Sequence, residues 1–317
     1  MKTKFISQLQ AGLSLTDQFV LTEKTMAHKK DGNSYLNLVL SDRTGRVKAV
    51  VWDNVDQIAS QSESGQVVVV TGHVGSYRGK LQMVVKELKA AAKDEINPAD
   101  FLPVTERDVD HMFERLQKLS QSLQKDCLRD LFGAFWSDET LVSQFKHAPA
   151  AKKMHHAYIG GLLEHTLSMA VLADKISEHY SGIDRDLLIA GVILHDIGKL
   201  REFTYDVAID YSDEGRLVNH IVIGIQMIED KIKAIPAFPE ETAMLLKHLI
   251  ISHHGSRELG SPEPPKTIEA VMLNCIDEMD SRVQAIREFM AKEDPGEKWT
   301  SYHRLLERHF FRGRPHD

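Results

Sequence analysis

The sequence has few of the residues that small secreted proteins use as covalent cross-links. Only two cysteines, Cys127 and Cys275, occur in 317 residues, and both fall in apolar stretches with helical periodicity. We therefore predict no disulfide and expect both thiols to be small core residues. No long uncharged apolar run could span a bilayer, and no apolar block with a cleavage site follows the N-terminal lysines. These absences predict a reduced, cytoplasmic protein without a membrane partner.

The net charge of −7 is unevenly distributed along the chain. Residues 1–90 carry 12 Lys/Arg and 8 Asp/Glu, whereas the remaining residues carry 27 and 38. This asymmetry favours polyanion binding in the first part and cation binding in the second. The length is sufficient for two domains, each with a core of its own.

Residues 17–88 have the pattern of a small β-barrel. Strands are predicted at Phe19–Leu21, Tyr35–Leu40, Val47–Trp52, Val67–Val70 and Leu81–Val85. Turn sequences separate most of them, among them Lys30-Asp31-Gly32-Asn33 and Tyr77-Arg78-Gly79-Lys80. A short helix or loop is expected between the third and fourth strands. Five strands with that interruption resemble an OB-fold, a barrel that binds oligonucleotides.

Single-strand binding on such barrels combines stacking aromatic rings with a basic track. The candidates here are Tyr35, Trp52, Tyr77, Arg78 and Lys80, with Phe19 as a further aromatic ring. The alternative for Tyr35 and Trp52 is a place in the barrel core. The polar hairpin tip at 77–80 favours a role facing a ligand.

The remainder of the chain is predicted to be helical. Residues 91–104, which include Pro98 and Pro103, have the composition of a linker, and a helix is expected to begin near Asp108. The one expected exception is residues 205–218, where short apolar runs flank Ser212-Asp213-Glu214-Gly215. The predicted fold class is therefore multidomain α and β. A five-stranded OB-fold barrel (1–90) and a linker (91–104) precede an all-α domain (105–317) with a small β-hairpin insertion.

Histidines are concentrated in the helical part. Ten of the sixteen lie between His147 and His254. His195 and Asp196 end an apolar run just before Gly198, and a buried imidazole beside a buried carboxylate is costly unless something compensates both. A histidine–aspartate hydrogen bond within the core is one solution, and a divalent cation is another. The cation is favoured because further potential ligands occur on separate predicted helices, namely His165, His220, His253, His254 and Asp277, with Asp280 as an alternative to Asp277.

The order of these residues resembles a known signature. His165, His195-Asp196 and Asp277 resemble the H…HD…D pattern of the HD superfamily of metal-dependent phosphohydrolases, and His220 with His253-His254 resembles its longer version. An OB-fold followed by such a domain is similar to the YhaM family of 3′→5′ exoribonucleases. Local matches are the runs His155-His156-Ala157-Tyr158-Ile159-Gly160-Gly161-Leu162-Leu163-Glu164-His165-Thr166 and Ser252-His253-His254-Gly255.

The resemblance implies roles for individual residues. One cation would be held by His165, His195, Asp196 and Asp277, and a second by Asp196, His220 and His253, with His254 as a ligand or a close neighbour. Lys199 would meet a phosphate oxygen, and His155 and His156 would contact substrate phosphate unless they belong to a surface loop. A mixed nitrogen and oxygen ligand set suits Mn²⁺, Fe²⁺, Co²⁺ or Zn²⁺ better than Mg²⁺. The resemblance itself implies manganese or cobalt.

The function that the resemblance implies is metal-dependent exonuclease activity. Such an enzyme shortens single-stranded RNA, and to some degree single-stranded DNA, from the 3′ end to nucleoside 5′-monophosphates. One alternative is an HD-type phosphodiesterase or nucleotidase acting on a small nucleotide, with the OB domain regulatory. Another is an RNA-binding protein whose helical domain is a scaffold. The sequence leaves the oligomeric state open, a homo-oligomer included.

Overall fold

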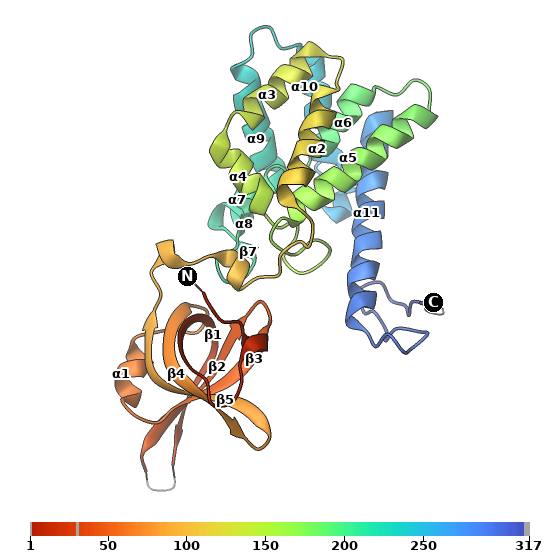
Figure 1. The fold of residues 1–317 in the computed structure, drawn as a ribbon. Coiled ribbons are helices and arrows are strands. Elements are labelled where there is room, and N and C mark those ends of the chain that lie inside the picture. The colour runs from red at the N-terminus through yellow and green to blue at the C-terminus, as the bar shows by residue number, and fades with distance from the viewer. Residues whose placement is uncertain (1, 30–31, 314–317) are drawn as a thin grey trace. The chain divides into compact units, whose positions relative to one another are not determined.

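The computed structural model describes residues 2–29 and 32–313, so Lys30 and Asp31 of the predicted turn at 30–33 lie outside the described residues. The chain divides into two compact units (Figure 1). The barrel unit comprises Met1–Val104 with Thr204–Ile209, and the helical unit comprises Thr105–Phe203 with Asp210–Asp317. No helix in the described part of the chain combines the length and the apolar character needed to cross a bilayer.

The barrel unit contains the five predicted strands, each longer than its sequence signal. They are β1 (Ser14–His28), β2 (Ser34–Asp42), β3 (Gly45–Val51), β4 (Val67–Tyr77) and β5 (Lys80–Ala90). They close in the order β1-β2-β3-β5-β4, with β3 and β5 parallel and the other pairs antiparallel. The short helix α1 (Val55–Ser60) lies between β3 and β4, as predicted. The prediction of an OB-fold barrel is confirmed.

Strand alternation decides which aromatic rings are buried. Leu36, Leu38 and Leu40 of β2 point into the barrel core, so Tyr35 points outward. Phe19 lies in the core and is 0% exposed, so its suggested stacking role is wrong. It occupies the same face of β1 as Leu21, because alternate residues of a strand share a face.

Residues 91–104 form short turns packed on the barrel. They include the 3₁₀ turns η2 (Lys93–Glu95) and η3 (Pro98–Asp100), and Phe101 packs against Val20 and Val67. A further 3₁₀ turn, η1 (Ile6–Gln8), precedes β1. The backbone N–H of Arg43 also donates to the carbonyl of Asp100 at 3.1 Å.

The helical unit is built from ten described helices. They are α2 (Val109–Gln121), α3 (Asp126–Trp136), α4 (Glu139–His147), α5 (Gly161–His179), α6 (Arg185–Leu194), α7 (Lys199–Glu202), α8 (Asp213–Val218), α9 (His220–Lys233), α10 (Glu240–Ser252) and α11 (Ile268–Lys292). A 3₁₀ turn, η4 (Arg257–Leu259), lies between α10 and α11. Asp108 is the N-cap of α2 and accepts a hydrogen bond from the N–H of His111, as the predicted helix start requires.

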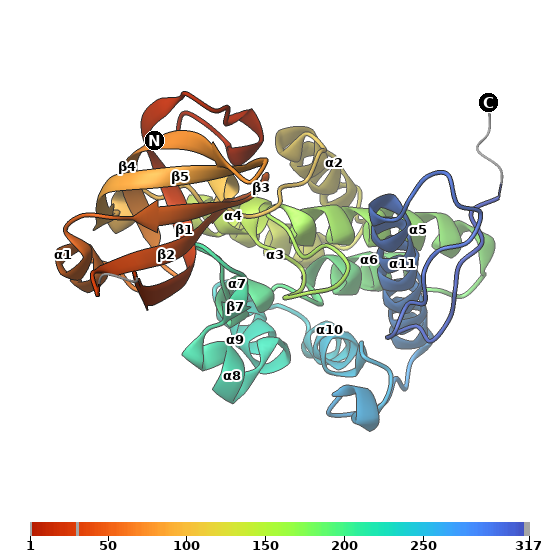
Figure 2. The same cartoon turned by 90° about the horizontal axis from the view of Figure 1, so that it is seen from below.

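Helix α6 is the centre of this unit. Every one of its residues from Asp186 to Leu194 is buried, and α5, α10 and α11 all pack against it. Both cartoon views show α11 running beside α5 and α6 (Figure 2). The outer face of α11 is exposed, and the prediction that Cys275 is a core residue is wrong because it lies on that face.

The small β-hairpin is present, but it begins earlier than predicted. Its strands are β6 (Phe203–Thr204) and β7 (Asp210–Tyr211). Ser212 does not begin a turn between strands but caps α8, because its hydroxyl accepts a hydrogen bond from the N–H of Gly215 at 2.9 Å. A serine cap followed by acidic residues in the first turn favours a helix at 213–218.

Residues 299–311 are a second exception to the helical prediction. Two antiparallel bridges, Trp299 with Phe311 and His303 with Arg308, close this segment into a loop. The ring of Phe289 on α11 lies 4.5 Å from that of His303, so the loop packs against the C-terminal half of the helix.

Candidate metal centre

Five helices deliver the predicted ligands to one buried place. His165 lies on α5 and Asp277 on α11, whereas His195 and Asp196 directly follow α6. His220 is the first residue of α9, and His253 with His254 directly follows α10. Most of these residues come from helix ends, where backbone direction changes and side chains of neighbouring helices can converge.

Two glycines allow the helix ends to approach. A Cβ on Gly198 would lie 1.9 Å from the carbonyl oxygen of His220, so only glycine lets the chain after Asp196 pass against the start of α9. Gly255 has φ +82°, and a Cβ there would lie 2.7 Å from the amide of Asn274. That amide donates to the carbonyl of His253 at 2.8 Å and fixes the turn after α10.

Asp196 lies between two groups of imidazoles. Its Oδ2 lies 3.1 Å from Nε2 of His195 and 3.9 Å from Nε2 of His165. Its Oδ1 lies 3.6 Å from Nε2 of His220 and 3.8 Å from Nε2 of His253. The two oxygens of one carboxylate therefore face two different sets of nitrogen atoms.

The remaining ligand candidates complete each group. Asp277 Oδ1 lies 3.4 Å from Nε2 of His165, and potential ligand atoms of His165, His195 and Asp277 lie within 4.8 Å of one another. The same limit holds for His220, His253 and His254. Two clusters of metal-ligating atoms thus lie on either side of Asp196.

Each of four imidazoles is held by its Nδ1. His195 donates to the carbonyl of Val192 at 2.8 Å and His253 to the carbonyl of Ile250 at 2.6 Å. In the other two rings Nδ1 is hydrogen-bonded to a carboxylate. His220 Nδ1 lies 2.9 Å from Glu202, and His165 Nδ1 lies 2.8 Å from Asp280. Carbonyl and ionised carboxylate oxygens only accept, so Nδ1 of each ring carries a proton and Nε2 points toward the cluster.

Buried polar atoms without partners show that this arrangement fits divalent cations. Within the described residues, Nε2 of His195, His220 and His253, Nδ1 of His254 and Oδ1 of Asp196 have no hydrogen-bond partner. Leaving one such atom unpaired in a protein interior costs about 1–3 kcal/mol, so a cluster of them requires compensation. Imidazole lone pairs and a carboxylate oxygen aimed at a common point are the donor set of a transition-metal site.

The charge balance of the cluster also favours a cation. Burial disfavours ionisation of Asp277, yet the hydrogen bond to His165 and the nearby imidazoles keep its pKa below the usual range. Burial would lower the pKa of His165, but hydrogen bonds to Asp277 and Asp280 raise that pKa to about 9. The carboxylates around His165 therefore stabilise positive charge at this point.

Asp280 takes the role of an orienting group behind His165. Its Oδ2 lies 2.8 Å from Nδ1 of His165 and 3.2 Å from Nε2 of His156, and its Oδ1 accepts from the Ser168 hydroxyl at 2.5 Å. Because Nδ1 and Nε2 lie on different edges of the ring, Asp280 and Asp277 contact opposite sides of His165. This geometry favours Asp277 over Asp280 as the ligand.

His156 belongs to the same hydrogen-bonded chain. It is 2% exposed, has φ +58°, and its Nδ1 lies 2.8 Å from the hydroxyl of Tyr158. That hydroxyl donates to Glu164 at 3.0 Å, and Glu164 also pairs with Arg107 at 3.0 Å. Both ring nitrogens of His156 are engaged, which does not fit the predicted contact with substrate.

Replacing Asp280 by asparagine tests this orienting role. We expect Mn²⁺ to bind the His165 side at least about tenfold more weakly, because partners behind a metal-bound imidazole fix its tautomer and raise its basicity. Calorimetric titration of Mn²⁺ measures the change. Asp230→Asn is the control, since Asp230 is an exposed aspartate on α9 paired only with Lys233 in the described chain. Equal Mn²⁺ affinity in both variants would contradict the orienting role.

A cavity of about 590 Å³ adjoins the cluster. His155, His254 and Asp277 line it, so cluster atoms reach solvent there. Burial, and next the charge of Lys199, lowers the pKa of His155 to about 4, so this imidazole is neutral near pH 7. The amine of Lys199 lies 2.6 Å from Asp196 Oδ2, which keeps the pKa of Lys199 raised despite its burial.

The predicted strand-binding residues form two exposed features of the barrel unit. Leu36 pairs with Val51, so Tyr35 and Trp52 are neighbours in the continuing register, and their rings stack with centroids 5.0 Å apart. Tyr35 is half-buried and Trp52 is 41% exposed, so neither ring belongs to the barrel core. Lys29 Nζ lies 4.8 Å from the centroid of Trp52 and adds a positive charge.

The tip of the β4–β5 hairpin is the second feature. Arg78 (φ +51°) and Gly79 (φ +76°) form its turn, a geometry that connects antiparallel strands tightly. Tyr77 is 58% exposed, and the Arg78 guanidinium lies 5.4 Å from its ring centroid. Lys80 begins β5 and is exposed. Strands 2 and 3 and the loop between strands 4 and 5 are the surfaces with which OB-folds bind oligonucleotides.

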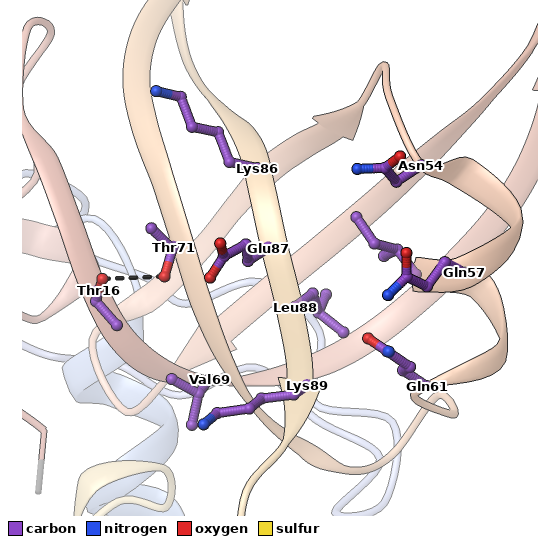
Figure 3. Close-up of a pocket in the computed structure, with 11 residues that line it drawn as sticks. Thr16, Asn54, Gln57, Gln61, Val69, Thr71, Lys86, Glu87, Leu88 and Lys89 are labelled. Carbon is purple, nitrogen blue, oxygen red and sulfur yellow. Dashed lines mark hydrogen bonds between the residues drawn. The ribbon is translucent and has the colours of Figure 1, made fainter.

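A separate cavity of about 490 Å³ lies between α1 and the strands β1, β4 and β5. Asn54, Gln57 and Gln61 line one side of it, and Lys86 and Lys89 of β5 lie opposite (Figure 3). The hydroxyls of Thr16 and Thr71 hydrogen-bond to each other at 3.0 Å on its wall. None of the predicted stacking residues lines this cavity.

Several residues of the metal centre were not predicted from the sequence. Glu202 accepts from both the backbone N–H and Nδ1 of His220, and Tyr158 and Glu164 extend the chain behind His156. Glu202 lies six residues after Asp196 in a short helix, which gives no periodic signal. Tyr158 and Glu164 lie within the run from His155 to Thr166, and its local match to the family was the available sign that these two residues belong to the site.

Comparisons with known protein families give a match within each of the two units. The HD domain family model matches residues 162–282, and a model described as an OB-fold nucleic acid binding domain matches residues 20–91. A model described as a putative helicase matches residues 97–181. The second OB-fold domain of replication protein A from Methanococcus maripaludis is a similar solved structure, with 25% identity over 28% of this chain and 94% of that chain and a TM-score of 0.23.

Two curated relatives align over nearly the whole chain. One is the 3′-5′ exoribonuclease YhaM of Geobacillus sp. (strain WCH70), 32% identical over 98% of this chain and 95% of the relative. The other is the 3′-5′ exoribonuclease YhaM of Bacillus velezensis (strain DSM 23117 / BGSC 10A6 / LMG 26770 / FZB42), 31% identical over 96% of each chain. Both units of the structure are therefore represented in these relatives.

Proposed function

Because the chain belongs to the YhaM family of 3′-5′ exoribonucleases, we propose that it removes nucleotides one at a time from the 3′ end of single-stranded RNA. The products would be nucleoside 5′-monophosphates, and single-stranded DNA would be a poorer substrate. The observation that carries this proposal is the set of partnerless imidazole nitrogens around Asp196. Such nitrogens can hold cations, and hydrolysis of a phosphodiester requires that the negative charge developing on the phosphate be stabilised.

Two divalent cations are the proposed cofactors, with manganese as the preferred metal. His165, His195, Asp196 and Asp277 would hold one, and Asp196, His220, His253 and His254 the other. When bound, such a pair lowers the pKa of water and stabilises the charge that develops on a phosphate. A ligand set rich in imidazole and free of thiolate favours manganese, cobalt, iron or zinc over magnesium.

The chain's own residues would orient the reacting phosphate. Asp196 holds the two ligand groups at a fixed separation, because each of its oxygens faces a different pair of imidazoles. His155, neutral near pH 7, can donate a hydrogen bond to the terminal phosphate from the wall of the 590 Å³ cavity. The amine of Lys199, which is paired with Asp196, would donate a hydrogen bond to a phosphate oxygen of the substrate.

The barrel unit would bind the strand upstream of the 3′ end. Tyr35 and Trp52 offer a stacking surface, and Tyr77, Arg78 and Lys80 offer a basic hairpin tip. Stacking on aromatic rings accepts every base, which suits an enzyme that must process unrelated sequences.

A labelled-strand assay tests the proposed activity. Single-stranded RNA with a 5′ label and Mn²⁺ is expected to give a ladder that shortens from the 3′ end and nucleoside 5′-monophosphates as the other product. Intact RNA alongside hydrolysis of a cyclic or mononucleotide substrate would instead favour a phosphodiesterase or nucleotidase. Intact RNA with tight binding and no hydrolysis of any nucleotide would favour a binding protein.

Charge on the hairpin tip should control the salt dependence of strand binding. Replacing Arg78 and Lys80 by alanine is expected to make the negative slope of log affinity against log salt shallower by about 1.4, since each contact with a single strand contributes about −0.7. Binding of a 20-nucleotide RNA at several salt concentrations measures it. Lys233→Ala is the control, because Lys233 is exposed and paired on α9. An unchanged slope would exclude the tip from the strand path.

A further inference from the structure

The helical unit has a second cavity that is separate from the one beside the metal centre. It has a volume of about 390 Å³ and lies between α2, α5 and α11. Three arginines line it, each from a different segment: Arg107 before α2, Arg115 on α2 and Arg287 on α11. Three guanidinium groups around one small cavity form a site that attracts an anion.

The three arginines of the cavity differ in their ion pairs. Arg107 pairs with Glu164 at 3.0 Å, but within the described residues neither Arg115 nor Arg287 forms an ion pair. Asp280 also lines the cavity and is 9% exposed. Its oxygens accept hydrogen bonds from Ser168 and His165, and within the described residues it forms no ion pair with an arginine of the cavity.

Part of the cavity lining is apolar. Val171 of α5 and Met279 and Val283 of α11 line it, and they are 36%, 42% and 43% exposed. Met279 and Val283 are four residues apart on α11, so they lie on one helix face. An apolar lining of this kind suits the flat base of a nucleotide, and arginines in the same cavity suit the phosphate that a nucleotide carries.

We propose that this cavity binds one nucleotide unit, with the phosphate held by Arg115 and Arg287 and the base lying on Val171, Met279 and Val283. Planar guanidinium groups bind phosphate through paired hydrogen bonds, and a volume of 390 Å³ falls within the range of small-ligand sites. The choice of a nucleotide among phosphate-bearing ligands rests on the proposed function. The bound nucleotide is either a free nucleoside monophosphate or one nucleotide of the bound strand.

Calorimetric titration of AMP into the full chain in EDTA tests the site, since EDTA keeps metal-dependent product binding out of the measurement. We expect saturable binding that the double variant Arg115→Ala/Arg287→Ala weakens at least about tenfold, as for the loss of charged hydrogen bonds. Arg282→Ala should leave it unchanged, because Arg282 lies on the same helix but is paired with Glu278 and does not line the cavity. Val283→Asp should weaken binding of AMP more than binding of inorganic phosphate.

The result that would overturn the proposal is AMP affinity that the arginine pair does not alter. AMP binding that requires Mn²⁺ and is lost in Asp277→Ala would also overturn it, because such binding belongs to the metal centre. A long single-stranded RNA that displaces AMP indicates a strand nucleotide, and AMP that stays bound indicates a free nucleotide. The 3′-shortening ladder is read separately, so a failed binding test leaves the proposed exonuclease function standing.

Discussion

Replacing Asp196 by alanine is expected to lower the rate of RNA hydrolysis at least about 1,000-fold, because the change removes the one group shared by both ligand clusters. The oxygens of Asp196 lie between 3.1 and 3.9 Å from four imidazole nitrogens, so neither cluster stays complete without it. Strand binding should stay within about twofold of the parent, since the proposed stacking and basic residues lie in the barrel unit. Ladder assays and RNA titrations on the same preparations measure both quantities.

Loss of Asp196 also leaves the Lys199 amine buried without its partner, which could unfold the site. Asp196→Asn keeps the volume and a hydrogen-bond acceptor, so it separates loss of metal from loss of structure. Asp230→Ala, a substitution of an exposed aspartate on α9, is the matched control. Substantial turnover in a folded Asp196→Asn or His195→Ala variant with Mn²⁺ present would show that the metal centre has been assigned to the wrong residues.

The second large effect is expected from the aromatic pair of the barrel unit. Replacing both Tyr35 and Trp52 by alanine should weaken binding of a long RNA about 100-fold, since a stacked base contributes about 1–3 kcal/mol. The two rings stack on each other at 5.0 Å, and Lys29 lies beside Trp52. Cleavage of a dinucleotide should change little, because such a substrate has no upstream nucleotides for the barrel unit to bind.

Single variants identify which ring contacts the strand. Trp52 is the more exposed ring, so Trp52→Ala should account for most of the loss. Tyr180→Ala is the control, because Tyr180 is an exposed tyrosine in the helical unit. An equal loss of activity on the dinucleotide would contradict a role in holding the strand and would favour destabilisation of the barrel instead.

Much of the histidine cluster could be predicted because its members lie at helix ends. His195, His220 and His253 each lie at a boundary marked by an apolar run and a polar or glycine residue. The carboxylates that orient His220 and His165 could not be predicted, because Glu202 and Asp280 lie 18 and 115 residues away from these histidines in the sequence. An acidic residue on a helix gives the same pattern whether it faces solvent or an imidazole.

In the fold, the incorrect predictions came from residues whose neighbours decide their environment. Phe19 and Trp52 are both aromatic residues in strand-like sequence, but only Phe19 shares its strand face with core residues. Ser212-Asp213-Glu214-Gly215 suits a turn or a capped helix equally well, and the hydrogen bond from Gly215 to Ser212 selects the helix. Cys275 is exposed because α11 covers α5 and α6 with its other face.

The most direct test of the two-cluster metal centre is the number of Mn²⁺ ions bound per chain at equilibrium, counted by dialysis with metal analysis. The arrangement around Asp196 predicts two ions for the parent chain and fewer than one for Asp196→Asn. Binding of no Mn²⁺ by the parent, or of two by Asp196→Asn, would contradict the assignment.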